Sequence, residues 1–453
     1  MAAAPLIGLW AAAVALAPGW APRIALAAPA LAIPFCRAVL ARPSRWVTLF
    51  LLAALLLPPL PIALGDSGPH VALAIAALGL AAGLWRAGEW RAPMSPYDLF
   101  LSAYALVLLA SIAPALLLSG GAIGALSLAR VGLFSISIYV FFYTACGPGA
   151  AARDESPGVA RWLFRAGVAA GIFACIDFYF QLPAPAGFGP QFVWLKSGVY
   201  RRAQGVFYEA STLGNVCVFF LVMAAVSLTR RKQESPVSRL ELAAGSACLF
   251  AALLASFSRA SVVNLAVACS VLVWLNRRAL RLARLAVALM IALAAGITFL
   301  YVAMPRIVEF YFRRLSGTLE AAESGAVLSG RLENWSHLLG FLAEHPEHAL
   351  LGVGYKTLAY SDVAGRAVIA DNAYLSALVE TGLVGLAAML LFNFAILRSG
   401  FHAARSPDAR ISFFGTWIAC FWTGEMVQML SGDLLTYWRV LPVYLWVLAN
   451  ARK

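Results

Sequence analysis

Charged residues are scarce in this chain of 453 residues. Asp, Glu, Lys and Arg together make up 12% of the sequence, whereas hydrophobic residue types make up 62%. The mean hydropathy is +0.82. A soluble protein of this composition would have too few polar side chains to cover its surface, so soluble classes are excluded. The composition therefore predicts an integral membrane protein.

The motifs of common metal and nucleotide sites are missing as well. The seven cysteines lie in apolar runs, which favours a role in helix packing over a disulfide framework or a zinc site. No D-x-D pair occurs in a predicted outer loop, and no GK[ST] sequence follows Gly352 and Gly354. We therefore expect no metal ion and no other cofactor, and we interpret the two glycines as part of a turn.

Apolar segments of membrane-spanning length are abundant. A span needs about 20 apolar residues, which gives about fourteen candidates, or about twelve if the first two form a re-entrant pair. They are expected near residues 4–19, 22–40, 46–64, 69–86, 97–118, 124–146, 160–181, 210–229, 239–257, 260–276, 282–304, 372–397, 409–430 and 436–450. The first lacks the features of a cleaved signal peptide, so a retained helix is expected there.

The predicted fold class is all-α. We expect a polytopic transmembrane helix bundle of about 12–14 helices with one large extracytoplasmic loop that contains amphipathic helices. Residues 1–304 would hold about eleven N-terminal transmembrane helices and residues 372–453 about three more. Residues 305–371 would form the large loop between them.

Basic residues predict which loops face the cytoplasm, because short cytoplasmic loops retain Lys and Arg. Alternate loops carry Arg37, Arg42, Arg45, Arg86, Arg91, Arg153, Arg161, Arg165, Arg230, Arg231, Lys232, Arg239, Arg277, Arg278, Arg281, Arg284, Arg398, Arg405 and Arg410. Both chain ends are expected on that same side. These loops account for most of the net charge of +13, so the charge does not require a nucleic-acid partner.

The polar loop from about Pro305 to Ala370 faces outward on this topology. Within it, Leu332, Trp335, Leu338, Leu339 and Leu342 recur at helical spacing. This spacing predicts an amphipathic helix over residues 331–344, stopped by Pro346. A second short helix is expected over residues 307–315.

Several short motifs occur in a recognisable order along this half of the chain. They are Arg202-Ala203-Gln204-Gly205, Ser258-Arg259, Ser329-Gly330-Arg331 with Trp335, Glu344-His345-Pro346, Gly352-Val353-Gly354, Asp371-Asn372-Ala373-Tyr374-Leu375 and Glu380-Thr381-Gly382. The order resembles the large loop of the O-antigen ligase and O-antigen polymerase family. The resemblance implies a multi-pass enzyme of the bacterial inner membrane with a periplasmic active site. It also implies an undecaprenyl-diphosphate-linked oligosaccharide as the glycan donor.

Outward-facing arginines are the candidate diphosphate ligands, because guanidinium groups bind phosphate oxygens bidentately and stay protonated. Arg259 and Arg331 match the arginines that the family's SR and SGR motifs contribute to this role, and Arg202 is a third candidate. Arg259 stands at the end of an apolar helix, so it could instead extend to lipid phosphates. Arg202 could be an ordinary loop arginine.

Two carboxylates are the candidate catalytic bases, Asp371 and Glu209. Asp371 stands where the related ligases carry a histidine before Asn, which is a departure from the ligase pattern. A carboxylate can also accept the proton of a sugar hydroxyl. Asp371 could alternatively be the N-cap of the helix that follows. His337 is a weaker alternative base, His345 is interpreted as structural, and Glu380 is expected to pair with an arginine.

The resemblance implies a polysaccharide polymerase, an inverting membrane glycosyltransferase that moves a glycan from undecaprenyl diphosphate to an acceptor sugar hydroxyl. The placement of the arginines independently favours an anionic ligand. One alternative is a ligase that transfers the same glycan to a lipid or a protein. A lipid-linked-glycan flippase or transporter is a second alternative, although no internal repeat supports it. Expected partners are the donor, an acceptor glycan or lipid, membrane lipids, and chain-length or export proteins.

Overall fold

The computed structural model of the protein describes residues 41–60, 69–91, 95–183, 188–195, 198–277, 298 and 331–452, with residues 3–19 and several positions between 22 and 39. These residues form a helical bundle with one two-stranded antiparallel hairpin. The predicted all-α class is confirmed. Apart from position 298, the helices expected over 282–304 and 307–315 lie outside the described residues.

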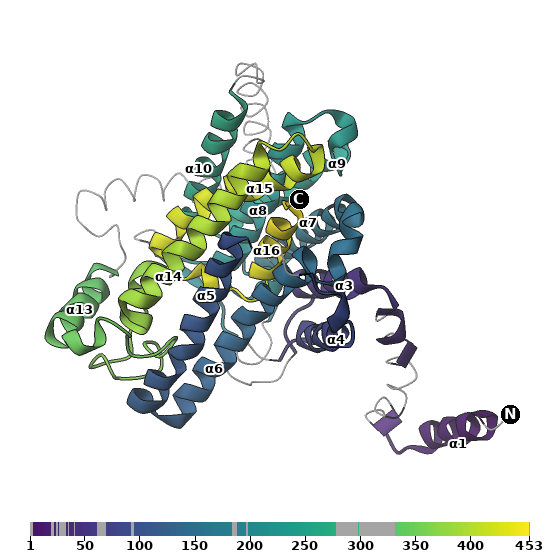
Figure 1. Ribbon diagram of the computed structural model, residues 1–453, viewed down its shortest axis with the longest axis horizontal. Helices are drawn as coiled ribbons and strands as arrows, with labels where there is room; N and C mark the ends of the chain where they lie inside the picture. Colours follow the sequence, from purple (N-terminus) through teal and green to yellow (C-terminus); the bar gives the residue numbers. More distant parts are fainter. Residues whose placement is uncertain are drawn as a thin grey trace.

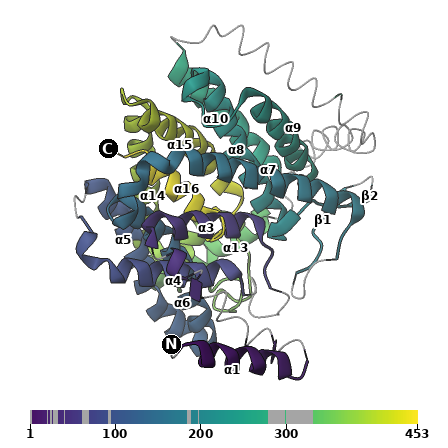
Figure 2. The ribbon, with the colours of Figure 1, turned by 90° about the vertical axis from the view of Figure 1, so that its right-hand side faces the viewer.

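The helices follow the predicted apolar segments closely (Figure 1). They are α1 (Ala3–Leu16), α3 (Pro43–Leu56), α4 (Val71–Trp85), α5 (Pro96–Ala110), α6 (Ile112–Ala145), α7 (Ser156–Phe180), α8 (Ala210–Thr229), α9 (Arg239–Ala255), α10 (Arg259–Asn276), α13 (Arg331–Glu344), α14 (Ala373–Ala404), α15 (Ala409–Gln428) and α16 (Leu441–Asn450). The strands β1 (Phe192–Leu195) and β2 (Gly198–Arg201) form a hairpin at the edge of the bundle (Figure 2).

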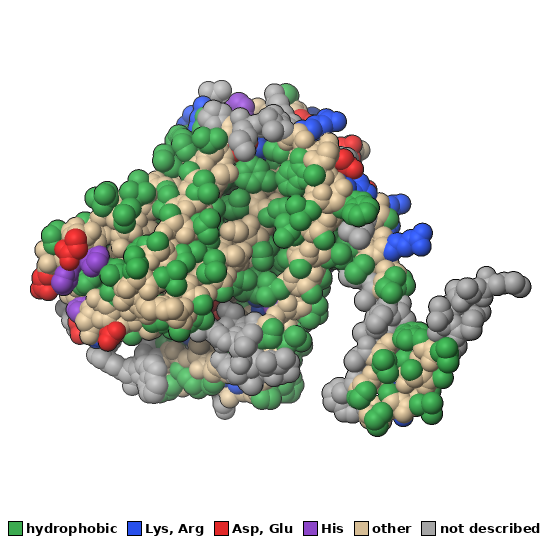
Figure 3. All heavy atoms as spheres, turned by 60° about the horizontal axis from the view of Figure 1, so that its bottom comes forward, with side chains coloured by type: hydrophobic (Ala, Val, Ile, Leu, Met, Phe, Trp, Pro, Cys, Tyr) green, Lys and Arg blue, Asp and Glu red, His purple; other side chains and the backbone are tan. Residues whose placement is uncertain are grey.

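Long apolar helices give the chain its membrane character. Among the described residues, 5 segments are long and apolar enough to cross a bilayer: Tyr97–Ala145, Arg153–Phe180, Ala210–Thr229, Arg259–Asn276 and Ala373–Ala404. Hydrophobic side chains cover the middle of the visible face, and charged side chains gather towards its edges (Figure 3). This distribution matches an apolar belt between two polar boundaries.

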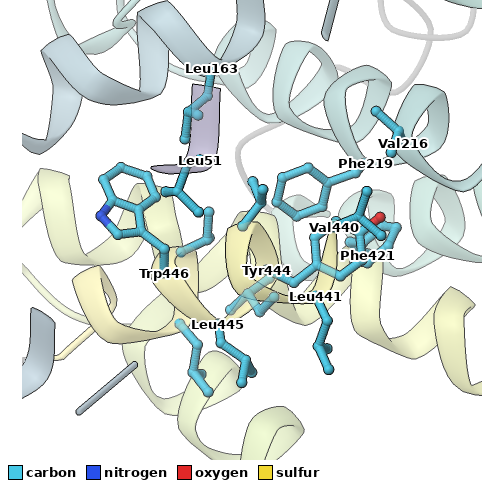
Figure 4. Packing of buried hydrophobic residues seen from close by; sticks show 14 of the residues in the cluster. Leu51, Leu163, Val216, Phe219, Phe421, Val440, Leu441, Tyr444, Leu445 and Trp446 are labelled. Atoms are coloured by element: carbon cyan, nitrogen blue, oxygen red, sulfur yellow. The ribbon is translucent and has the colours of Figure 1, made fainter. Parts of the chain in front are cut away.

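Several helices inside the bundle are shorter than a membrane span. All ten residues of α16 are buried, and its length of about 15 Å is half of the roughly 30 Å hydrocarbon core. Phe219 of α8 and Phe421 of α15 pack around Tyr444 of α16 in the centre of the core (Figure 4). The sequence predicted a full span at 436–450, and the structure replaces it with this short core helix.

Helix α14 is broken at Gly382, which has φ +68°. A loop segment, residues 349–354, replaces the hydrogen bonds that the break removes. The segment makes four backbone hydrogen bonds to α14: Val353 N to Val379 O (3.1 Å), Gly354 N to Glu380 O (2.8 Å), Leu383 N to Ala349 O (2.8 Å) and Val384 N to Leu350 O (3.3 Å). Unpaired backbone groups cost several kcal/mol away from water, so the break and the loop depend on each other.

Glycine is required where these two backbones meet. A Cβ atom on Gly352 would lie 2.4 Å from the Glu380 carbonyl, and one on Gly354 would lie 2.5 Å from Cα of Ala115 in α6. Both glycines also have positive φ angles. The expected turn at Gly352 and Gly354 is therefore a close junction between the loop, α14 and α6.

We predict that Gly382→Ala destabilises the fold. The new Cβ atom would lie 2.2 Å from the Leu350 carbonyl oxygen, and each orphaned buried backbone group costs about 1–3 kcal/mol. The unfolding midpoint of the purified protein in detergent should fall clearly. Gly340→Ala is the matched control, because a Cβ atom there meets nothing within 4 Å and should be neutral or mildly stabilising. Equal midpoints for the two variants would contradict this account of the junction.

Candidate active site

The first part of the site lies where the chain enters α8 and where it turns from α9 into α10. The Arg202 N–H donates to the Gln191 carbonyl (2.8 Å) and the Ala203 N–H to the Ala255 carbonyl (2.9 Å). The Arg202 guanidinium Nε donates to the Ser256 carbonyl (2.9 Å). Arg202 therefore contacts the turn that carries Arg259, as expected if both serve one site.

Arg259 is the first residue of α10. Ser258 caps the helix, with its hydroxyl accepting from the Ser261 N–H (3.4 Å). The Arg259 side chain is exposed, and it has no hydrogen bond or ion pair to any residue that the structure describes. A cation at a helix N-terminus is repelled by the positive end of the helix dipole. An anion, in contrast, is attracted both by the guanidinium of Arg259 and by the helix N-terminus. This position therefore suits an anionic ligand.

A buried polar network supports the Arg259 turn from below. It joins Ser258 and Ser261 at the start of α10 to Asn264 of the same helix, Asn215 of α8, and Glu425 and Gln428 of α15. The Glu425 carboxylate accepts from the Asn215 amide (2.5 Å) and from the Asn264 amide (3.0 Å). Because these hydrogen bonds are buried and link α8, α10 and α15, they fix the relative positions of the three helices.

Glu209 occupies the N-cap position of α8, and its side chain makes no cap bond. Its carboxylate instead accepts from the Thr212 hydroxyl (2.6 Å) and the Tyr437 hydroxyl. Burial raises the pKa of Glu209 above its ordinary value, against the lowering effect of these bonds and of Arg202. A carboxylate with a raised pKa is a stronger proton acceptor, which is what a general base requires.

The second part of the site lies between α13 and the start of α14. The structure confirms α13 as a helix over residues 331–344. The Arg331 Nε lies 3.3 Å from the Asp371 carboxylate, so two of the predicted site residues form an ion pair. The indole of Trp335 donates to the Ala370 carbonyl (2.7 Å) and holds α13 against this segment. The charge of Asp371 also acts on Glu209.

Asp371 is not the N-cap of α14, so this alternative is wrong. The cap is Asn372, whose side-chain oxygen accepts from the Tyr374 N–H (3.0 Å) and the Leu375 N–H (3.1 Å). Asp371 instead has φ +48°. This left-handed conformation turns the chain into the helix and directs the carboxylate to Arg331.

The remaining acid–base candidates are occupied by structural contacts. The expected pairing of Glu380 with an arginine is wrong for the described residues: its carboxylate accepts from the Leu358 N–H (3.4 Å) and interacts with the charge of Lys356. The imidazole Nε2 of His337 bonds the Ala364 carbonyl (2.7 Å). His345 precedes a short 3-10 turn and bonds Glu347 (3.1 Å).

A cavity of about 340 Å³ opens beside Glu209. It is lined by Pro59, Arg130, Phe188, Phe207, Tyr208, Glu209, Thr212, Tyr360, Thr436, Tyr437, Trp438 and Arg439. Arg130 of α6 donates to the Tyr360 hydroxyl (2.7 Å) and lies 5.0 Å from the centre of its ring. In the sequence, Arg130 falls inside a predicted membrane helix, and it was not identified as a site residue. A lone arginine in an apolar run nevertheless indicates a candidate functional position.

Arg439 is the most buried cation of this cavity, with 9% of its surface exposed. Its guanidinium donates to three backbone carbonyls, those of Ala54 (3.0 Å), Leu57 (2.6 Å) and Val206 (2.7 Å). The carbonyls of Ala54 and Leu57 lie at the C-terminal end of α3, where the helix dipole favours a cation. Burial nevertheless lowers the pKa of Arg439 to about 9.

Residues 244–390 match the family model described as O-Antigen ligase. Over this part of the chain the protein is similar to O-antigen ligases. The resemblance seen in the sequence motifs is thereby confirmed over these residues. No curated protein matches the chain. The matched region contains Arg259, Arg331 and Asp371, whereas Arg202 and Glu209 precede it. It indicates glycan transfer of the ligase or polymerase type in a membrane.

The capping contacts generate a stability prediction. Asn372→Ala removes the acceptor for two backbone N–H groups and should lower the free energy of unfolding by about 1 kcal/mol. Asp371→Asn should change it less, because asparagine tolerates the left-handed conformation and a partly exposed ion pair contributes about 0–1 kcal/mol. Denaturant titration of both purified variants measures the difference. A larger loss for Asp371→Asn would return the capping role to Asp371.

Proposed function

We propose that the protein is a polysaccharide polymerase that transfers a glycan from undecaprenyl diphosphate to an acceptor sugar hydroxyl at the outer face of the bacterial inner membrane. The observation that carries this proposal is the contact of Arg202 with the Arg259 turn, at the end of the bundle where Glu209 begins α8. Cations and a basic carboxylate therefore lie near one end of the bundle. The basic loops support a periplasmic position for this end and a cytoplasmic position for both termini.

The arginines suit a diphosphate leaving group. Arg259 has no partner among the described residues, and within the same part of the chain Arg331 uses its Nε for Asp371 and no other partner of its guanidinium is found. Bidentate hydrogen bonds to the diphosphate would stabilise the negative charge that develops as the glycosidic carbon–oxygen bond breaks. In this role Asp371 is a positioning residue that orients Arg331.

Glu209 is better placed than Asp371 to act as the base. It lines the cavity and is hydrogen-bonded by neutral hydroxyl groups, whereas Asp371 is paired with an arginine. The acceptor hydroxyl gives its proton to the carboxylate while its oxygen forms the new bond to the anomeric carbon. The diphosphate leaves from the opposite face with the bonding electrons, so the configuration inverts.

Ligation to a lipid or protein is the second candidate, favoured by the description of the matched family model. The two functions use the same donor and differ in the acceptor. Deletion of the gene separates them through the lipid-linked glycans that accumulate. Single repeat units on the lipid support the polymerase, and full-length polymer on the lipid supports the ligase.

Arg259 generates a prediction for donor binding. Arg259→Lys keeps the charge but loses the planar fork, so the KM for the lipid-diphosphate donor should rise about tenfold or more. Arg366→Lys is the control, because this arginine is half-exposed on the loop and pairs with Asn334 and Glu333. Chain extension by purified protein measures both. Unchanged donor KM in Arg259→Lys and Arg259→Ala would rule out the diphosphate role.

Glu209 generates a pH prediction. A base works only when ionised, so the rate should fall as the pH drops through the raised pKa of Glu209. The acidic limb of the pH–rate profile should therefore lie at a higher pH than it would for a glutamate with an ordinary pKa. Glu209→Gln should abolish this limb and reduce kcat by about 10²–10⁴-fold. Glu333→Gln is the matched control, since its side chain is exposed on α13. A normal kcat in Glu209→Gln would move the base to Asp371.

A further inference from the structure

The cavity beside Glu209 contains a buried cation that the reaction scheme does not use. Arg439 is more than nine-tenths buried, and its hydrogen-bond partners among the described residues are neutral backbone carbonyls. Its guanidinium also lies 4.8 Å from the centre of the Phe207 ring. These contacts hold the side chain in place but supply no negative charge. A buried ion is normally paired, because desolvation costs several kcal/mol.

The three carbonyls use three of the five guanidinium N–H groups. The side chain also lines the cavity, so an anion inside it can reach the remaining donors. Arg130 stands in the wall of the same cavity and adds a second positive charge.

The rest of the wall suits a sugar ring. Phe188 and Tyr208 lie with ring centres 5.1 Å apart, and Tyr360, Tyr437 and Trp438 add further aromatic surface. Aromatic side chains with a few fixed polar groups are typical of small-molecule sites. The volume of about 340 Å³ is near the lower end of the usual range of about 300–1,000 Å³. This volume is large enough for a sugar unit.

We propose that this cavity binds the acceptor sugar and that this sugar carries an anionic group, a carboxylate or a phosphate ester, which pairs with Arg439. The assignment to the acceptor rests on the proposed function, because Glu209 in the same wall is the proposed base. The diphosphate candidates Arg202, Arg259 and Arg331 are not among the residues that line the cavity. The site thus predicts a glycan with an acidic residue at its growing end.

Binding of matched sugars to the purified protein tests the proposal without requiring catalysis. The probes are 4-nitrophenyl β-glucuronide, the corresponding β-glucoside, glucose 6-phosphate and inorganic phosphate, each titrated by saturation-transfer NMR. We expect an anionic sugar to bind about tenfold more tightly than the glucoside. One charge-assisted hydrogen-bonded pair contributes a gain in affinity of this size. Whichever of glucuronide and glucose 6-phosphate binds more tightly identifies the anionic group.

Variants assign the preference to Arg439. Arg439→Gln should remove the advantage of the anionic sugar and leave glucoside binding unchanged. Arg366→Gln removes an arginine of the outer loop that does not line the cavity, and it should retain the preference. If Arg439→Gln fails to fold after losing its contacts to α3, Arg439→Lys and the wild-type comparison of glucuronide with glucoside decide the question.

Two results would overturn the proposal. One is equal affinity of the wild-type protein for charged and neutral sugars. The other is inorganic phosphate binding as tightly as either anionic sugar, which would make the cavity a phosphate site. Loss of polymerase activity is a separate outcome: if the protein transfers no glycan but still prefers the anionic sugar, only the assignment to an acceptor fails.

Discussion

The structure depends on an exchange of backbone hydrogen bonds between a broken helix and a loop. At Gly382 the α14 ladder is interrupted, and the segment 349–354 supplies both donors and acceptors to the interrupted turn. In an apolar environment such a break is tolerated only when the freed groups are paired again. The loop is therefore fixed to the helix, and everything attached to either of them is positioned by this junction.

The Arg331–Asp371 pair lies close to this junction along the chain. Asp371 stands eleven residues before the break, at the N-terminal end of α14, and α13 is followed by a short 3-10 turn and then by the docked segment. Trp335 ties α13 to the residue before Asp371. Because both ends of this connection are held, Arg331 is presented from an ordered helix rather than from a free loop, which suits a residue that must meet a ligand in one geometry.

A second set of constraints holds the other cations. The network of Asn215, Asn264, Glu425 and Gln428 joins α8, α10 and α15 beneath the Arg259 turn. The Ser256 carbonyl of that turn accepts from Arg202. Arg439, far along the chain, closes the cavity by bonding the end of α3. The positions of charged groups from separate parts of the sequence are thus set by buried polar contacts.

The sequence by itself determined the membrane class, most helix positions and the chemistry of the candidate residues. Apolar runs end where polar or proline residues begin, so α8 and α15 match their predicted ranges within a few residues. The motif order likewise identified Arg259, Arg331 and Asp371. Only the tertiary structure decided that Asn372 caps α14, that Asp371 pairs with Arg331, and that Arg130 and Arg439 line a cavity with Glu209. These outcomes depend on contacts between residues distant in sequence. The periodicity of a sequence shows which face of a helix is apolar, but it does not show which other element packs against that face.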